Sequence, residues 1–210
     1  MRSKASAKTR DKVLEAARAL FNEQSTAAVS LDDIATAAKI SPEDLAHHFR
    51  EKQEIVRALF DQYWRALDGR WYPDKDPARN VAMMVRNLKD MTTLRWDFRF
   101  FQREMLLLLR ADTRLRSAYE AVSERRFSEM RVFAQQLVLQ DMVRVPRLPR
   151  TIDDLLMAVW LITEGWQAYL DLTGTPADQD QVGRLDDLLM VAIDPYLTDR
   201  GRELFEKLAQ

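Results

Sequence analysis

The sequence predicts an all-α protein, with a small three-helix head at its N-terminus and a larger helical domain after it. Glycine and proline are scarce, with five and seven among 210 residues, and these are the residues that most often interrupt helices. Apolar residues recur at spacings of three and four along most of the chain, which is the period of one buried helical face. A hydrophobic content of 47% supplies enough apolar surface for a core, so a disordered chain is excluded.

The first predicted helix covers residues 9–24. One face of it is apolar, and the residues on that face are Val13, Leu14, Ala17, Leu20 and Phe21. A later helix opens at Lys52 and has its apolar positions at Ile55, Val56, Leu59, Phe60 and Tyr63. This later helix is predicted to lead away from the head as a long connecting helix.

Two short helices that meet at a corner are predicted by the stretch SLDDIATAAKISPEDLAHHF. Ser30 and Asp33 have the spacing of a capping box, in which a hydroxyl and a carboxylate satisfy exposed amides at a helix start. Ser41 and Asp44 repeat this spacing, with Pro42 at the first helical position, where a missing N–H costs nothing. Two short, separately capped helices joined by about three residues are typical of a helix-turn-helix. The pattern therefore predicts a DNA-reading element.

Two breaks divide the rest of the helical pattern. Gly69–Pro77 has turn chemistry, and Met142–Arg150 contains two prolines, which cannot continue a helix. Thr151 is a candidate start for the helix after the second break. The helices expected beyond the connecting helix cover residues 77–93, 96–110, 113–139, 152–173, 180–197 and 199–208.

The head resembles that of the tetracycline-repressor (TetR) family of bacterial transcription regulators over roughly residues 9–60. The residues that carry the resemblance are Val13-Leu14-Glu15-Ala16-Ala17, Leu20-Phe21, Ile34-Ala35, Ile40-Ser41, Leu45, His48-Phe49 and Lys52-Gln53-Glu54-Ile55. The resemblance implies a sequence-specific DNA-binding regulator, foremost a repressor that a small-molecule ligand releases. It also implies a DNA-binding domain over residues 1–51, and a connecting helix with a ligand-binding and dimerisation domain over residues 52–210.

DNA contacts are expected from the corner and from the second short helix. The candidates are Ser30, Lys39, Ser41, Pro42, Glu43, Asp44, His47, His48 and Lys52. In the family the position of His48 lies near the DNA backbone, and that of His47 can face bases. We expect Lys52 to act on all sequences alike by meeting a phosphate, and Asp44 to influence which bases are preferred. A symmetric dimer implies a pseudo-palindromic duplex as the partner.

Five residues of the head depart from the family pattern. Ser25 and Lys39 stand where glycines are usual, and a positive φ at Lys39 would cost about 1–2 kcal/mol. Ala46 replaces an aromatic residue that touches a phosphate in the family, and Glu43 and Asp44 place carboxylates at the start of the reading helix. A carboxylate facing DNA is unfavourable unless it accepts from cytosine N4. These departures leave open a second interpretation, a dimeric ligand-sensing or interaction protein whose head has weak or lost DNA affinity.

The N-terminal segment is basic. Its first twelve residues hold five cations and one carboxylate, which are Arg2, Lys4, Lys8, Arg10, Lys12 and Asp11. Each cation that neutralises a phosphate adds salt-dependent affinity, and a basic arm can also reach a minor groove. The alternative is a solvated tail that aids solubility.

The last two long helices predict a homodimer surface. Helix 152–173 is apolar around too much of its circumference for a surface helix, and Gly165 near its middle would let another backbone approach. The resemblance implies that two such helices from each subunit form a four-helix interface. The expected interface residues are Leu155, Val159, Ile162, Leu185, Leu188, Leu189 and Ala192. The alternative is that both helices fill the chain's own core.

The resemblance also implies that the larger domain binds a small-molecule effector. Pockets for small molecules are commonly apolar with a few polar groups. Arg103 shares a helical face with Arg95 and Arg99, which suits either an anionic ligand or a solvated face. Glu164 lies among apolar neighbours and is costly to bury unpaired, so it would pair with an arginine or orient a donor group of the ligand. The candidate effector-binding residues are Trp96, Phe100, Arg103, Glu164 and Trp166.

Several protein classes are not expected. The absence of cysteine excludes disulfides and thiolate metal sites and fits a reducing compartment. Both histidines lie in the head, so no acid–base constellation indicates an enzyme or a cofactor, and Asp44 with His48 lacks a third metal ligand. The longest apolar run, Leu155–Ile162, is far shorter than the roughly 20 residues that cross a bilayer. With no apolar stretch at the N-terminus, we expect a cytoplasmic protein.

Overall fold

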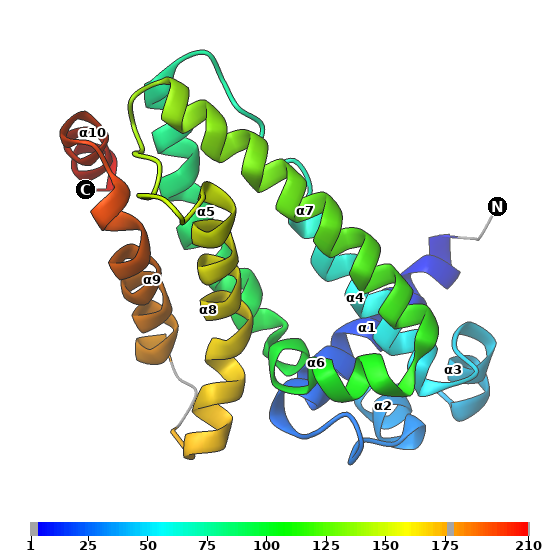
Figure 1. The fold of residues 1–210 in the computed structure, drawn as a ribbon. Helices are drawn as coiled ribbons and strands as arrows, with labels where there is room; N and C mark the ends of the chain where they lie inside the picture. The colour runs from blue at the N-terminus through cyan, green and yellow to red at the C-terminus, as the bar shows by residue number, and fades with distance from the viewer. Residues whose placement is uncertain (1–3, 176–178, 210) are drawn as a thin grey trace. The chain divides into compact units, whose positions relative to one another are not determined.

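The computed structural model describes residues 4–175 and 179–209, and its helices are labelled in Figure 1. The helices are α1 (Lys4–Glu23), α2 (Leu31–Ala38), α3 (Pro42–His48), α4 (Lys52–Ala66), α5 (Pro77–Asp97), α6 (Arg99–Ala111), α7 (Thr113–Leu139), α8 (Ile152–Thr173), α9 (Gln179–Ile193), the 3₁₀ turn η1 (Asp194–Tyr196) and α10 (Asp199–Ala209). No strand occurs among the described residues, which confirms the all-α prediction.

The chain forms two compact units. Unit 1 consists of Met1–Ala66 and Asp97–Arg116, and unit 2 consists of Leu67–Trp96 and Ser117–Gln210. The boundary expected after residue 51 falls inside unit 1, because α4 and α6 belong to the same compact unit as the head. Among the described residues, no helix is both long and apolar enough to cross a membrane.

The N-terminal basic segment is largely helical. Because α1 begins at Lys4, ahead of the predicted start, residues 8–12 lie on a helix and do not form an extended arm. The guanidinium of Arg10 stacks over the ring of Phe49, 5.1 Å from its centroid. Arg2 lies outside the described residues. Any DNA contact from Lys8, Arg10 or Lys12 therefore has to come from a face of α1.

One core holds the helices of unit 1 together. Its fully buried side chains include Phe21, Leu14, Ile34, Ile55, Leu59, Phe60, Phe100 and Phe101. Phe21 of α1 and Phe100 of α6 are in contact, with ring centroids 5.4 Å apart. Helix α3 has only seven residues and is too short to be stable alone. Burial of Leu45 and Phe49 in the shared core therefore keeps it folded.

In unit 2, the start of α10 is fixed to the segment after α7. Thr198 donates its N–H to Met142 O at 3.1 Å, and Arg144 donates its N–H to Tyr196 O at 2.6 Å. A Cβ on Gly201 would lie only 2.1 Å from Met142 O, so this approach of two backbones requires glycine.

Helices α8 and α9 lie side by side in unit 2 (Figure 1). Thr151 caps α8 with a reciprocal capping box to Asp154, which confirms the predicted helix start. Gly174 ends the helix with a φ of 64°. Helix α9 stops at Ile193 and not at the predicted residue 197, because Pro195 continues the chain as a 3₁₀ turn.

Candidate nucleic-acid interface

The start of α2 is fixed by a complete capping box. Ser30 Oγ accepts from Asp33 N at 3.1 Å, and Asp33 Oδ2 accepts from Ser30 N at 2.8 Å. The hydrogen bonds from the side chain and backbone of Ser30 lower the pKa of Asp33 below its usual value. The predicted reciprocal arrangement at this helix is confirmed.

The corner between α2 and α3 is a Schellman turn centred on Lys39. Lys39 donates its N–H to Thr36 O at 3.1 Å, and Ile40 donates its N–H to Ala35 O at 3.1 Å. Lys39 itself has φ 56° and ψ 48°, the left-handed conformation that glycine adopts most easily. The corner therefore requires a positive φ, and lysine occupies the position at a cost in backbone strain. Ser25 shows no such strain, because its φ is not positive.

The start of α3 forms only half of the expected capping box. Ser41 Oγ accepts from Asp44 N at 3.0 Å, and Pro42 stands in the first turn. Within the described residues the carboxylate of Asp44 makes no return bond to Ser41. This carboxylate is exposed and is available to another partner.

The outer face of α3 carries several of the residues that the sequence predicts to contact DNA. Pro42, Glu43, Ala46 and His47 are exposed, whereas His48 is half-buried. Leu45 points inward. The exposed face thus presents the carboxylates of Glu43 and Asp44, the imidazole of His47 and the small side chain of Ala46.

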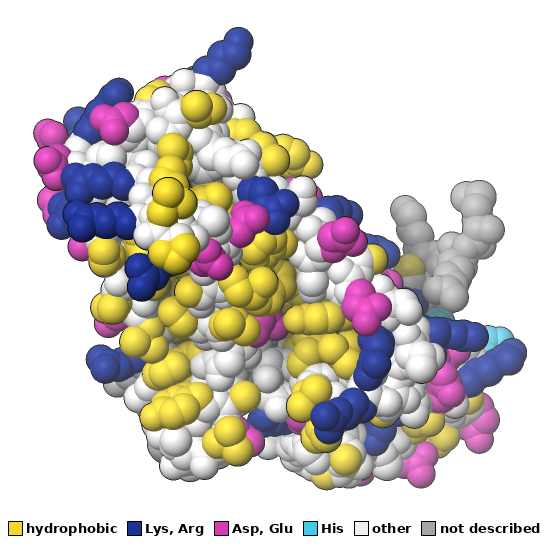
Figure 2. Space-filling model, in the orientation of Figure 1, with side chains coloured by type: hydrophobic (Ala, Val, Ile, Leu, Met, Phe, Trp, Pro, Cys, Tyr) yellow, Lys and Arg dark blue, Asp and Glu magenta, His cyan; other side chains and the backbone are white. Residues whose placement is uncertain are grey.

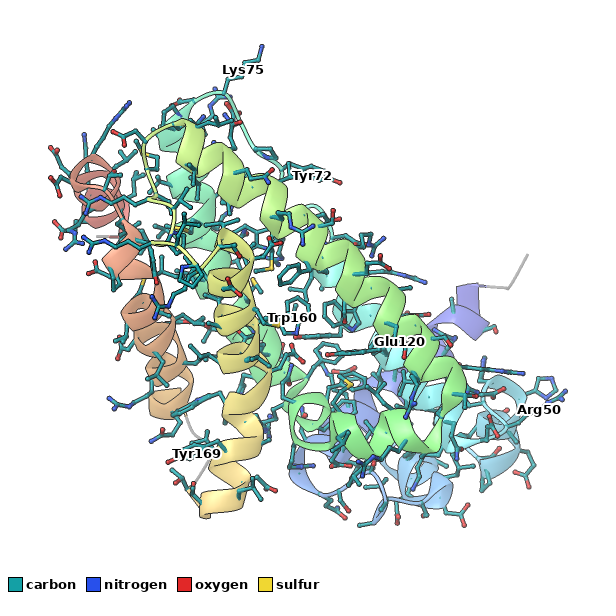
Figure 3. The ribbon with its side chains drawn as sticks, in the orientation of Figure 1. Arg50, Tyr72, Lys75, Glu120, Trp160 and Tyr169 are labelled. Atoms are coloured by element: carbon teal, nitrogen blue, oxygen red, sulfur yellow. The ribbon has the colours of Figure 1, made fainter. Side chains whose placement is uncertain are left out.

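Lys52 makes hydrogen bonds inside the head that the sequence did not predict. Its Nζ donates to Thr26 O at 2.5 Å and to Val29 O at 2.7 Å, so its ammonium holds the loop between α1 and α2. The phosphate-binding role expected for Lys52 stays a prediction. Arg50, which is not among the contacts predicted from the sequence, is exposed and extends into solvent beside α3 (Figure 3). Its position directly after the second short helix is the sequence signal that would have indicated it.

Two of the candidate effector residues belong to unit 1. Phe100 is fully buried against Phe21. The guanidinium of Arg103 donates to backbone carbonyls of the α1 end, including Phe21 O at 2.7 Å, and pairs with Glu104 at 2.7 Å. Because these contacts already use both side chains, we do not retain Phe100 and Arg103 as effector ligands.

The other candidates lie in unit 2. Burial raises the pKa of Glu164 on α8, while Arg95 on α5 opposes that rise. Burial raises the pKa of Tyr119 on α7 as well, and the nearby Glu164 carboxylate raises it further. Trp166 donates from Nε1 to Gln181 O at 2.9 Å and so connects α8 with α9. Trp96 is half-buried and is the last residue of α5 that belongs to unit 2. Two other helices, α5 through Arg95 and α7 through Tyr119, therefore place ionisable groups within electrostatic reach of Glu164.

The apolar surface of α8 and α9 differs from the predicted one. Leu185 and Leu189 are buried inside the chain, so they are excluded from a surface. The half-buried candidates are Leu155, Val159, Ile162, Leu188 and Ala192. The large apolar residues of the two helices that are exposed, which we call the α8–α9 face, are Met157, Leu161, Tyr169, Leu172 and Val191. Figure 2 shows hydrophobic side chains at the surface over these helices.

Comparisons with known proteins match both parts of the chain. A family described as bacterial regulatory proteins, tetR family, matches residues 13–59, and one described as bacterial transcriptional repressor matches residues 62–205. The transcriptional regulator UidR of Escherichia coli K12 is 30% identical over 84 residues, which are 40% of this chain and 43% of UidR. The chain thus matches less than half the length of that curated relative.

Solved structures match nearly the whole chain. A TetR-family regulator from Marinobacter aquaeolei VT8 is 27% identical, with a TM-score of 0.80, over 96% of this chain and 98% of that one. SmeT in complex with triclosan is 18% identical, with a TM-score of 0.62, over 91% and 93% of the two chains; this second likeness shows the fold alone. By the family matches over both of its parts, the chain belongs to the TetR family of bacterial transcriptional regulators.

Proposed function

We propose that this protein is a homodimeric repressor that reads a pseudo-palindromic duplex and leaves it when a small molecule binds. The observation that carries the proposal is the α2–α3 corner. Two capped helices meet at a Schellman turn, and the outer face of the second helix makes no contribution to the core. A rigid helix with a free polar face is what entry into a major groove requires. Such a regulator acts in the cytoplasm, where the chromosome lies.

Base reading is assigned to Glu43, Asp44 and His47. An exposed carboxylate can accept from the N4 amino group of cytosine, and an imidazole can donate to or accept from a base edge. Arg50 is assigned to a phosphate, because its side chain is exposed next to α3. Carboxylates repel the phosphate backbone, so we expect modest affinity and a preference for C·G pairs near the start of α3.

The direct test is selection of bound sequences from random duplexes, at low and at moderate salt. We expect enrichment of a palindrome whose half-sites lie one or more helical turns apart. Asp44→Ala should change the preferred base at one position of each half-site, whereas Arg50→Ala should weaken all sequences alike. If no palindrome were enriched at either salt, the alternative would hold, in which the head has lost useful DNA affinity.

The partner for the α8–α9 face is proposed to be a second copy of the chain. Leu161 and Leu172 are 62% and 86% exposed, and a Cβ on Gly165 would meet no atom within 4 Å. Two copies that cover this face would form a two-fold interface of four helices, which matches the symmetry of a palindromic site.

The dimer proposal can be tested with two matched leucines. Leu161→Glu should convert the protein to a monomer in sedimentation and weaken palindrome binding. Leu148→Glu, at an 89% exposed leucine of the α7–α8 connection, should leave the dimer intact. A monomeric wild-type protein at micromolar concentration would refute the proposal.

The effector site is assigned to the ionisable groups around Glu164 in unit 2. Trp160 projects from α8 in the direction of α7 (Figure 3) and provides an aromatic surface beside Glu164 and Tyr119. A related fold, that of SmeT, is seen with triclosan, an aromatic molecule. Compounds that release the protein from its selected duplex should bind Glu164→Ala at least about tenfold more weakly, since a hydrogen bond to a charged group contributes roughly 1.5–3 kcal/mol.

A further inference from the structure

The carbonyl end of α1 is held by one arginine of α6. The Arg103 guanidinium donates to Phe21 O at 2.7 Å, to Asn22 O at 3.3 Å and to Gln24 O. The last carbonyls of a helix have no partner within the helix, and a cation at this end also meets the favourable side of the helix dipole. Arg103 therefore fixes the point at which α1 ends and the loop to α2 begins.

The next residue of α6 holds the loop itself. Glu104 Oε2 accepts from Thr26 N at 2.9 Å and from Thr26 Oγ1 at 2.5 Å, while Glu104 Oε1 pairs with Arg103 at 2.7 Å. The side chains of Arg103 and Glu104 are only 18% and 9% exposed. Because each charge is compensated by the other and by backbone groups, this buried pair is fully engaged in binding α1 and its loop.

Helix α4 holds the same loop residue, Thr26, through its backbone carbonyl. Lys52 Nζ donates to Thr26 O and to Val29 O. Thr26 therefore gives its N–H and hydroxyl to α6 and its carbonyl to α4. Only three residues separate it from Ser30, which caps α2 and starts the helix-turn-helix.

We propose that Arg103 and Glu104 are positioning residues for DNA reading, and that Thr26 is the point where a displacement of α6 reaches the α2–α3 corner. Hydrogen bonds weaken steeply as their length and angle depart from the optimum. A small shift of α6 would therefore break the bonds to Thr26 and release the loop, whereas non-directional apolar contacts would tolerate such a shift. Along the sequence, the segment Asp97–Arg116, which contains α6, follows one segment of unit 2 and precedes the other. This inference rests on the proposed function.

The decisive variants are Thr26→Val, which removes the hydroxyl donor at constant shape, and Thr26→Ser, which keeps it. The readout is the ratio of affinities for the selected palindrome and for a non-specific duplex at one salt concentration. We expect Thr26→Val to lower this ratio about tenfold, in line with the loss of a hydrogen bond to a charged group. Affinity for the non-specific duplex should not change, since no phosphate contact is removed, and Thr26→Ser should restore the ratio to within about twofold.

Glu104→Gln tests the same contact from α6, without relying on a change at Thr26. The double variant with Thr26→Val should lower the affinity ratio no further than either single variant does, because both changes act on one contact. Phe100→Leu is the matched control, since it weakens the core of the same unit without touching the polar contacts. It should lower the melting temperature and leave the affinity ratio unchanged. Equal effects of Thr26→Val and Phe100→Leu on the ratio would overturn the inference.

Amide hydrogen exchange provides a readout that needs no duplex. Thr26→Val should speed exchange in residues 30–48 and leave α4 protected, whereas Phe100→Leu should speed exchange in α1 and α6. If the wild-type protein selected no palindrome, the proposed function would fail while this measurement still tested the coupling. If it did select one, and Thr26→Val matched the wild type in both readouts, the inference alone would fail.

Discussion

Replacing Lys39 with glycine should make the protein more stable. The residue has φ 56°, and a side chain in this left-handed conformation costs about 1–2 kcal/mol. Glycine removes that cost but gains conformational freedom in the unfolded chain, which offsets roughly 0.4–1 kcal/mol. The two hydrogen bonds of the turn come from backbone N–H groups and survive the change. We expect a net gain of about 0.5–1 kcal/mol in the free energy of unfolding.

The measurement is urea unfolding followed by circular dichroism, with Lys39→Ala as the control. Alanine removes the same cation but keeps a Cβ at positive φ, so its free energy of unfolding should stay within about 0.5 kcal/mol of the wild type. Both variants should lose the same DNA affinity if the lysine charge meets a phosphate. A glycine variant no more stable than the alanine variant would refute the argument that this corner stores backbone strain.

Three further changes test other parts of the structure. Gly201→Ala should cost about 3 kcal/mol in unfolding free energy, because its Cβ would meet Met142 O at 2.1 Å; a neutral result would contradict the close approach. Burial raises the pKa of Glu164, so its carboxylate destabilises the fold above that pKa; Glu164→Gln should melt higher than the wild type at about pH 8, and the gap should close as acid protonates the wild type. A gap of equal size at every pH would mean that this carboxyl does not titrate. Arg50→Ala should flatten the slope of log affinity against log salt by about one unit without lowering the melting temperature. Lys52→Met should lower the melting temperature and leave this slope unchanged. If Lys52→Met flattened the slope and Arg50→Ala did not, the phosphate contact would belong to Lys52.

The helical pattern of the sequence predicted most of the fold. Local signals were sufficient where a residue acts on its own helix, as Ser30, Ser41 and Thr151 do at helix starts. The family resemblance is confirmed by the matches over both parts of the chain. It also indicated that Lys39 would be strained if the turn needs a positive φ there, and the observed φ is 56°. DNA contacts, the effector and the dimer stay predictions.

Long-range polar contacts were the part that the sequence did not reveal. Lys52 and Arg103 bind backbone carbonyls in the segment from residue 21 to residue 29, and a carbonyl acceptor has no sequence signature because every residue carries one. Periodicity had the same limit in α9. It identified an apolar face containing Leu185 and Leu189, but it could not tell that the chain's own core covers them.

The division of labour within α3 has a consequence for how such proteins diversify. Its inward residues, Leu45 with the adjoining Phe49, secure folding, while its outward residues Glu43, Ala46 and His47 contact nothing that the core needs. Mutations at the outward positions are therefore expected to be nearly free of any folding penalty. A gene duplicate could acquire a new target sequence by drift at these three codons, while the rest of the molecule stayed under unchanged selection.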